Sequence, residues 1–184
     1  MKKVILWAVV LFVGVLSFFL VTSRKNDKAL VAYFSATGNT KLVAEKLAKG
    51  IDADLFEIKP EQVYSADDLN WRNDKSRSSV EMKDANSRPL IESKIDNFAQ
   101  YKIIFVGFPI WWGREPAIIN TFMTSYDFAG KTVVPFATSG STPSTDEAAT
   151  NIQSLVPNAT VLTGKRFSVD VSSEELKTWA LGQK

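Results

Sequence analysis

The sequence contains no cysteine and no histidine among its 184 residues. Their absence excludes zinc fingers, cysteine proteases, Ser-His-Asp hydrolases and histidine-ligated metal or haem centres. It also excludes a lipid anchor attached through cysteine. Any chemistry must therefore come from hydroxyls, carboxylates, Lys and Arg, aromatic rings or a bound cofactor.

Positive charge is not concentrated anywhere beyond the first 28 residues. Those residues hold five of the 22 basic and one of the 20 acidic side chains, which leaves 17 basic and 19 acidic groups for residues 29–184. Nucleic-acid binding needs a clustered basic face, so we expect no nucleic-acid partner. The 45% hydrophobic and 23% charged composition is that of a globular protein, and the length suits one domain with an appendage.

Residues 4–23 form an uncharged apolar run. Twenty residues at about 1.5 Å each span the roughly 30 Å core of a bilayer. The run is longer than the apolar region of a typical signal peptide, and no A-x-A motif follows it. We therefore expect residues 1–23 to form an N-terminal hydrophobic helix that anchors the protein in a membrane. Cleavage after Ser23, which would secrete the domain, is the alternative.

The basic residues before the apolar run resemble the start of an export signal, which favours an extracytoplasmic location for the rest of the chain. Residues 24–28 read as a polar linker, and residues 29–184 as the domain. The domain alternates short apolar runs with helical patterns, which predicts the α/β class with a parallel sheet covered on both faces. The predicted strands are residues 29–34, 54–59, 102–108, 131–137 and 159–164.

The predicted helices have recognisable beginnings. Residues 40–51 repeat apolar side chains at helical spacing, and Pro116 suits the first turn of the third helix. Two capping boxes, Ser144 with Glu147 and Ser172 with Glu175, predict where the last two helices start.

Between the second and third strands lie more than forty residues, 60–101, which is far longer than a crossover needs. Short helices are expected around residues 66–72 and 78–83. The segment is either functional, such as a lid, or disordered.

In open α/β sheets ligands bind at the carboxyl ends of the strands. The loop after the first strand, residues 35–40, combines hydroxyls, an amide and a glycine immediately before a helix. Such a loop suits a phosphate group or an ordinary helix-capping turn, and it is neither a Walker A motif nor G-x-G-x-x-G. It consists of Ser35, Ala36, Thr37, Gly38, Asn39 and Thr40.

Two further loops follow the third and fourth strands. The first contains two adjacent indoles. Either both are core or interface residues, or one packs inward and the other offers a flat face to a planar ligand. The second offers hydroxyls and backbone amides without charge. Their candidate binding residues are Pro109, Ile110, Trp111, Trp112 and Gly113 in the first, and Ser139, Gly140 and Ser141 in the second.

The segments Tyr33–Thr40, YFSATGNT, and Gly107–Gly113, GFPIWWG, resemble the flavodoxin family, specifically the branch with a YFS-x-[ST]-GNT loop and a GxPIWWG loop. The resemblance extends over residues 29–182. It implies a flavodoxin-like three-layer sandwich with a five-stranded parallel sheet of order 2-1-3-4-5 and noncovalently bound FMN. Residues 35–40 would hold the phosphate, while residues 109–113 and 139–141 would flank the isoalloxazine. Related proteins often carry a histidine where Ser139 stands, and many carry an aromatic ring in that loop.

Three functions follow from this resemblance. The first is a membrane-tethered electron carrier that works with a redox partner protein. The second is an NAD(P)H-dependent quinone reductase, and the third is a flavin-free binding module. Arg114 would either stabilise the reduced flavin at its N1/C2 edge or pair with Glu115.

Overall fold

The computed structural model describes residues 28–138 and 144–183. The predicted N-terminal hydrophobic helix and its membrane-anchor function, together with Ser139, Gly140 and Ser141, lie outside the described residues. Within the described part of the chain, no helix combines the length and apolar character that a bilayer-spanning segment requires.

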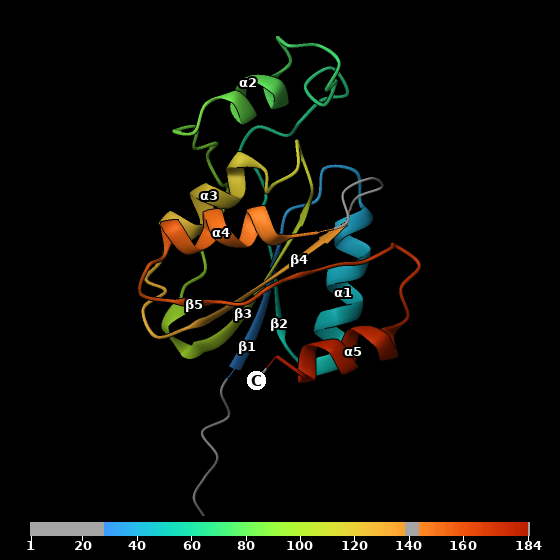
Figure 1. Ribbon diagram of the computed structural model, residues 1–184, viewed down its shortest axis with the longest axis vertical. Coiled ribbons are helices and arrows are strands. Elements are labelled where there is room, and N and C mark those ends of the chain that lie inside the picture. Colours follow the sequence, from blue (N-terminus) through green and yellow to red (C-terminus); the bar gives the residue numbers. More distant parts are fainter. Residues whose placement is uncertain (1–27, 139–143, 184) are drawn as a thin grey trace, which may run out of the picture.

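The domain is a parallel sheet between two layers of helices (Figure 1). The strands are β1 (Lys28–Tyr33), β2 (Asp54–Glu57), β3 (Tyr101–Pro109), β4 (Thr132–Thr138), β5 (Thr160–Val161) and β6 (Lys165–Arg166). Their order is β2-β1-β3-β4-β5, and β6 also pairs with β4. The predicted order 2-1-3-4-5 is confirmed.

Over residues 28–138 and 144–183, five α-helices lie around and above the sheet. They are α1 (Asn39–Ile51), α2 (Arg77–Lys83), α3 (Ala117–Thr124), α4 (Asp146–Leu155) and α5 (Ser173–Leu181). Helices α1 and α5 contact each other on one face of the sheet, and α3 and α4 contact each other on the opposite face (Figure 1).

The sheet separates two hydrophobic clusters, and alternation along β1 shows why. Leu30 and Ala32 belong to the cluster that includes Phe122 of α3, whereas Val31 and Tyr33 belong to the one that includes Leu47 of α1. Successive side chains of a strand point to opposite faces. A strand buried on both faces is therefore apolar at nearly every position, as β1 is.

The predicted fifth strand, 159–164, is wrong in its extent: within it only Thr160–Val161 form a strand, β5, and a further short strand, β6, follows at Lys165–Arg166. Leu162 donates to the Val133 carbonyl and Phe167 to the Ala137 carbonyl. By alternation the backbone of Pro135 faces the same edge, but proline has no N–H to donate. Gly164 passes so close that a Cβ there would lie 2.3 Å from the Pro135 carbonyl oxygen.

The predicted helix start at Ser172 is confirmed, whereas the one at Ser144 is wrong. Ser172 accepts from the Glu175 N–H and starts α5. The fourth helix instead begins after Thr145, and Ser144 Oγ accepts from the N–H of Asp146, only two residues on. The Glu147 carboxylate is directed toward Gly113 rather than back along its own helix.

Residues 60–101 are ordered, and most of them, including α2, lie above the carboxyl edge of the sheet, whereas residues 98–101 lie at its amino edge, where β3 begins (Figure 1). The expected helix around 78–83 is present as α2, whereas residues 66–69 form turns rather than a helix. A 3₁₀ turn, η1 (Phe98–Gln100), leads into β3. The hypothesis that this segment is disordered is therefore wrong, and we call residues 60–91, whose ends are joined by the bridge between Pro60 and Ile91, the cap segment.

Candidate functional site

The strands β1, β3 and β4 end at the same edge of the sheet because they are parallel. Register places Tyr33 opposite Gly107, and Pro109 opposite Thr138. The first two predicted binding loops therefore leave the sheet from adjacent strands.

The loop over residues 35–40 is a tight turn that leads into α1. Ser35 Oγ accepts a hydrogen bond of 3.1 Å from the Gly38 N–H. Gly38 has a φ of +91°, a backbone conformation that residues with a Cβ rarely adopt. Nothing lies within 4 Å of the point where a Cβ would project from Gly38. The loop thus leaves open space at the start of the helix.

The N-terminus of α1 is suited to an anion. Among the residues that the structure describes, no side chain caps its first N–H groups, and its first turn contains no acidic residue. These unpaired donors and the positive end of the helix dipole together attract phosphate. Thr37 and Asn39 are exposed beside them, whereas Ser35, Ala36 and Gly38 are half-buried.

Thr40 has a structural position in this loop. It is 1% exposed, and its hydroxyl lies 2.8 Å from that of Thr138, the last residue of β4. This hydrogen bond joins the first loop to the carboxyl end of β4.

The loop after β3 reverses direction at the two tryptophans. Trp111 and Arg114 exchange backbone hydrogen bonds of 2.9 and 3.1 Å. Between them Trp112 and Gly113 both have positive φ, +48° and +88°. A positive φ is rare for an aromatic residue and marks strained backbone at functional sites.

The prediction that the two indoles diverge is confirmed. Trp111 packs edge-on against Phe34, with 5.6 Å between ring centroids, and against Tyr64, at 5.4 Å. Trp112 is 48% exposed. One indole therefore holds the loop on the body of the protein while the other remains available at the surface.

Arg114 pairs with Glu115, which was one of the two roles predicted for it. Its Nη1 lies 3.4 Å from Glu115 Oε1, and its Nη2 donates to the Met82 carbonyl at the end of α2. Glu115 is fully buried, and Asn151 of α4 approaches its other oxygen at 3.5 Å. Burial raises the pKa of Glu115 to about 6, although Arg114 and Asn151 oppose the shift.

Tyr64 attaches the cap segment to Phe34 and Trp111. Its ring lies 5.7 Å from Phe34, its hydroxyl donates to Glu81, and the Arg77 guanidinium lies over its ring at 4.1 Å. Arg77 also donates to Glu81 at 2.6 Å. Burial and the neighbouring Glu81 carboxylate raise the pKa of Tyr64, so its hydroxyl stays protonated.

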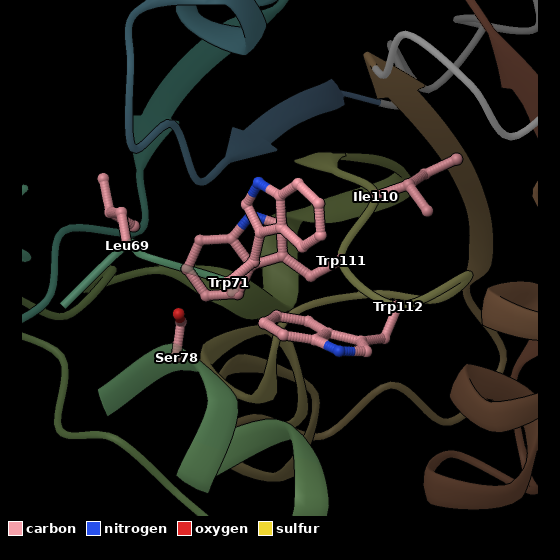
Figure 2. A pocket seen from close by; sticks show the side chains of 6 residues that line it. All are labelled: Leu69, Trp71, Ser78, Ile110, Trp111 and Trp112. Atoms are coloured by element: carbon pink, nitrogen blue, oxygen red, sulfur yellow. The ribbon is translucent and has the colours of Figure 1, made fainter. Parts of the chain in front are cut away.

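A cleft of about 350 Å³ opens between the tryptophan loop and the cap segment. Figure 2 shows the Ser78 hydroxyl rising from α2 toward the indoles, while Ile110 points away from them. We call this the aromatic cleft; its lining residues are Leu69, Trp71, Ser78, Ile110, Trp111 and Trp112.

Several of these residues escaped prediction from the sequence. Tyr64, Trp71 and Ser78 lie in a segment without regular periodicity, so no pattern indicated what they would contact. Glu115 is a charged residue that follows an exposed turn, which favours an exposed position. Only Trp71, a large aromatic ring in a polar segment, gave a signal in the sequence.

The family profile named flavodoxin matches residues 28–182. This chain belongs to the flavodoxin family. A comparison with curated proteins finds no match.

Solved structures of flavoproteins share the fold. A candidate flavoprotein from Bacteroides uniformis is 48% identical with a TM-score of 0.79, covering 84% of this chain and 97% of its own. Another candidate, from Bacteroides eggerthii, is 44% identical with a TM-score of 0.80, over 85% and 98%. A Lactobacillus acidophilus flavoprotein in complex with FMN is 23% identical with a TM-score of 0.63, over 84% and 99%.

Proposed function

We propose that this flavodoxin-family protein binds FMN and transfers electrons while tethered to a membrane. The observation that carries the cofactor assignment is the uncapped N-terminus of α1 behind the positive-φ turn at Gly38. A phosphate monoester matches its unpaired N–H groups. The FMN complex of the Lactobacillus acidophilus flavoprotein supports the same cofactor.

The residues at the site fit this cofactor. Residues 35–40 would hold the phosphate, with Gly38 leaving room and the exposed Thr37 and Asn39 side chains offering further polar groups. Residues 109–113 would flank the ring, because their turn presents backbone amides and the exposed Trp112. Bound FMN supplies one-electron and two-electron chemistry.

The direction of the tether bears on the redox partner. Lys28 begins β1 at the amino edge of the sheet, opposite the loops of the site (Figure 1). An anchor at residues 4–23 would join the domain from that edge. The site would then face away from the bilayer, which favours a redox partner protein in the same compartment. We place the domain on the extracytoplasmic side, with a cleaved and secreted form as the alternative.

A quinone reductase that uses NAD(P)H is the second candidate. The aromatic cleft favours it, because an electron carrier has no need of a binding cavity beside the predicted flavin loop. A flavin-free binding module is disfavoured, because both the open turn at Gly38 and the uncapped helix are present.

The discriminating experiment follows the visible spectrum of the purified full chain in detergent. FMN is added first, and then NADH or NADPH under anaerobic conditions. A flavin spectrum that is bleached only by dithionite or a partner reductase supports the carrier. Direct bleaching by the nicotinamide supports the reductase, and the absence of FMN binding overturns both.

A further inference from the structure

A cavity of about 280 Å³ lies at the amino edge of the sheet, opposite the predicted flavin loops. Residues of two segments line it, 123–129 before β4 and 155–159 before β5. The register of the parallel strands puts the starts of β1, β3, β4 and β5 at this same edge. We call this cavity the amino-edge pocket.

Hydrogen bonds and ring stacking hold the walls of the amino-edge pocket in place. The Gly130 N–H donates to the Asn158 carbonyl at 2.9 Å and so joins the two loops. Tyr126 stacks on Phe98 with 4.4 Å between ring centroids, and its hydroxyl accepts from the Ile95 N–H at 2.9 Å. The cavity is therefore formed before any ligand binds, as most ligand sites are.

The charge at the amino-edge pocket is negative. Asp127 is the one charged residue among its described lining residues, and none of the ion pairs within the described part of the chain includes it. Helix α3 ends there at Thr124 and α4 at Leu155, and neither has a basic residue in its last turn. Helix C-termini carry partial negative charge. Lys131 does not line the pocket, and its Nζ donates to the Tyr101 carbonyl at 2.6 Å.

Beneath this negative rim the lining is apolar and aromatic. Met123, Phe128 and Val156 are buried, and Tyr126 is half-buried beside them. Cations bind favourably to aromatic faces, whereas an anion would be repelled by Asp127 and by both helix ends. A primary ammonium group fits best, because its three N–H donors match a carboxylate and carbonyl oxygens. The pocket thus suits a small organic ammonium ion.

The position of the amino-edge pocket indicates the source of such an ion. The start of β4 lies two strand spacings from Lys28, roughly 10 Å, because β3 separates β1 from β4. Four residues, 24–27, separate Lys28 from the apolar run that ends at Ser23, so these two residues can be at most about 18 Å apart. A bilayer that holds the apolar run would therefore bring its lipid headgroups to the pocket.

We propose that the amino-edge pocket binds the ethanolamine headgroup of a phospholipid, with its ammonium group donating to the Asp127 carboxylate. The inference rests on the proposed membrane tether and adds a lipid contact to it. A choline headgroup has no N–H group to donate, so the pocket prefers ethanolamine. Headgroup binding would fix how the domain stands on the bilayer and would turn the predicted flavin loops toward the aqueous phase.

Amide chemical shifts of the isotope-labelled, FMN-loaded full chain in detergent micelles test this proposal. The followed signals are those of Ala129 and Asn158, which line the pocket. The probes are dihexanoylphosphatidylethanolamine, dihexanoylphosphatidylcholine and N-acetyl-lysinamide, which carries the ammonium group of a protein side chain. The test variant is Asp127→Asn, whose side-chain oxygen can still accept from the Ala129 N–H. Asp67→Asn is the matched control, because Asp67 is an exposed residue of the cap segment.

We expect the ethanolamine lipid to shift both signals saturably, and the choline lipid to bind about tenfold more weakly. The two lipids partition into micelles through the same acyl chains, so the difference reports the headgroup. Asp127→Asn should weaken binding of the ethanolamine lipid about fivefold, the effect of one lost ion pair at a partly exposed site. Asp67→Asn should leave it unchanged. FMN affinity should be the same in both variants, because the pocket lies at the other edge of the sheet.

Three outcomes overturn the proposal while the tether stands. The first is that the ethanolamine lipid binds no better than the choline lipid, and the second is that Asp127→Asn does not weaken its binding. The third is that N-acetyl-lysinamide binds as tightly as the ethanolamine lipid, which would make the pocket a site for a lysine of a partner protein. A full chain that stays in the supernatant when phosphatidylcholine vesicles are sedimented after detergent removal would instead overturn the tether itself.

Discussion

Gly38 is the residue on which the predicted phosphate site depends most. Its φ of +91° costs little in glycine, whereas a β-branched side chain is strained there. Ser35 Oγ receives the Gly38 N–H, so any change of this backbone also displaces the turn.

We expect Gly38→Val to abolish FMN retention while the protein stays folded, because the strain of about 1–2 kcal/mol falls on a loop outside the hydrophobic core. The measurement is the flavin absorbance of the purified variant, with circular dichroism as the check of folding. A variant that purifies yellow would show that the phosphate binds elsewhere.

Glu115 makes stability depend on pH at the same site. Burial raises its pKa to about 6, above its ordinary value of 4.5. Because the folded pKa is the higher one, the carboxyl group favours folding while it is protonated. That contribution is complete below pH 4.5 and is lost as the pH rises through about 6.

Glu115→Gln should remove this loss. Between pH 4.5 and 7.5 the wild type should lose about 2 kcal/mol of unfolding free energy that the variant keeps, since one pKa unit corresponds to about 1.4 kcal/mol. Glutamine still accepts from Arg114. Urea unfolding of both proteins at the two pH values checks the prediction, and parallel changes in the two proteins would refute it.

The loops at residues 35–40 and 109–113 could be predicted from the sequence, because each follows an apolar strand and interrupts its pattern. The side chains that these residues contact could not be predicted. The hydrogen bond between Thr40 and Thr138 joins positions 98 residues apart, and Arg114 and Glu115 find their partners in α2 and α4, respectively. Such contacts are set by tertiary packing, which single-residue tendencies do not encode.

At the scale of elements, the sequence of β4 determines where the edge strands β5 and β6 can pair with it. Apolar runs predicted β1, β3 and β4 within a residue or two, because strands buried on both faces have few alternatives. The interruption between β5 and β6 arises from Pro135 in the adjacent strand β4. The sequence does not show which residues lie opposite this proline, because that depends on the register of the strands. The glycine opposite that proline is therefore under steric constraint.

We expect Gly164→Ala to lower the free energy of unfolding by about 1–3 kcal/mol, because the new Cβ would overlap the Pro135 carbonyl. Gly50→Ala is the matched control. A Cβ at Gly50 in α1 meets its neighbours at 3.6 Å or more, so alanine should stabilise the helix by about 0.5–1 kcal/mol. Thermal melts compare the melting temperatures of the two variants. Equal shifts of the same sign would contradict the claim that Gly164 is under steric constraint.

Helix α2 is joined to the tryptophan loop by the hydrogen bond from Arg114 to the Met82 carbonyl. Removing this charged donor with Arg114→Ala should raise amide hydrogen exchange in α2 about tenfold, and leave exchange in α5 unchanged. Unchanged α2 exchange would show that Tyr64 and Arg77 hold the cap segment alone. A shifted two-electron potential without faster exchange would instead favour the role of Arg114 at the flavin edge.

On the scale of the whole molecule, the chain places its two candidate functions at opposite edges of the sheet. The N-terminal end of β1 lies at one edge, and the binding loops and the cap segment lie at the other (Figure 1). The alternating pattern of strands and helices predicted this sheet. The cap segment has no such pattern, so its position over the carboxyl edge was beyond sequence reasoning.

The most direct test of the account is the visible spectrum of the purified full chain titrated with FMN, with Gly38→Val beside it. The account predicts saturable binding of one FMN per chain by the wild type, with a perturbed flavin spectrum, and none by the variant. A wild-type chain that leaves the spectrum of free FMN unchanged would contradict the central claim that this edge of the sheet is a flavin site.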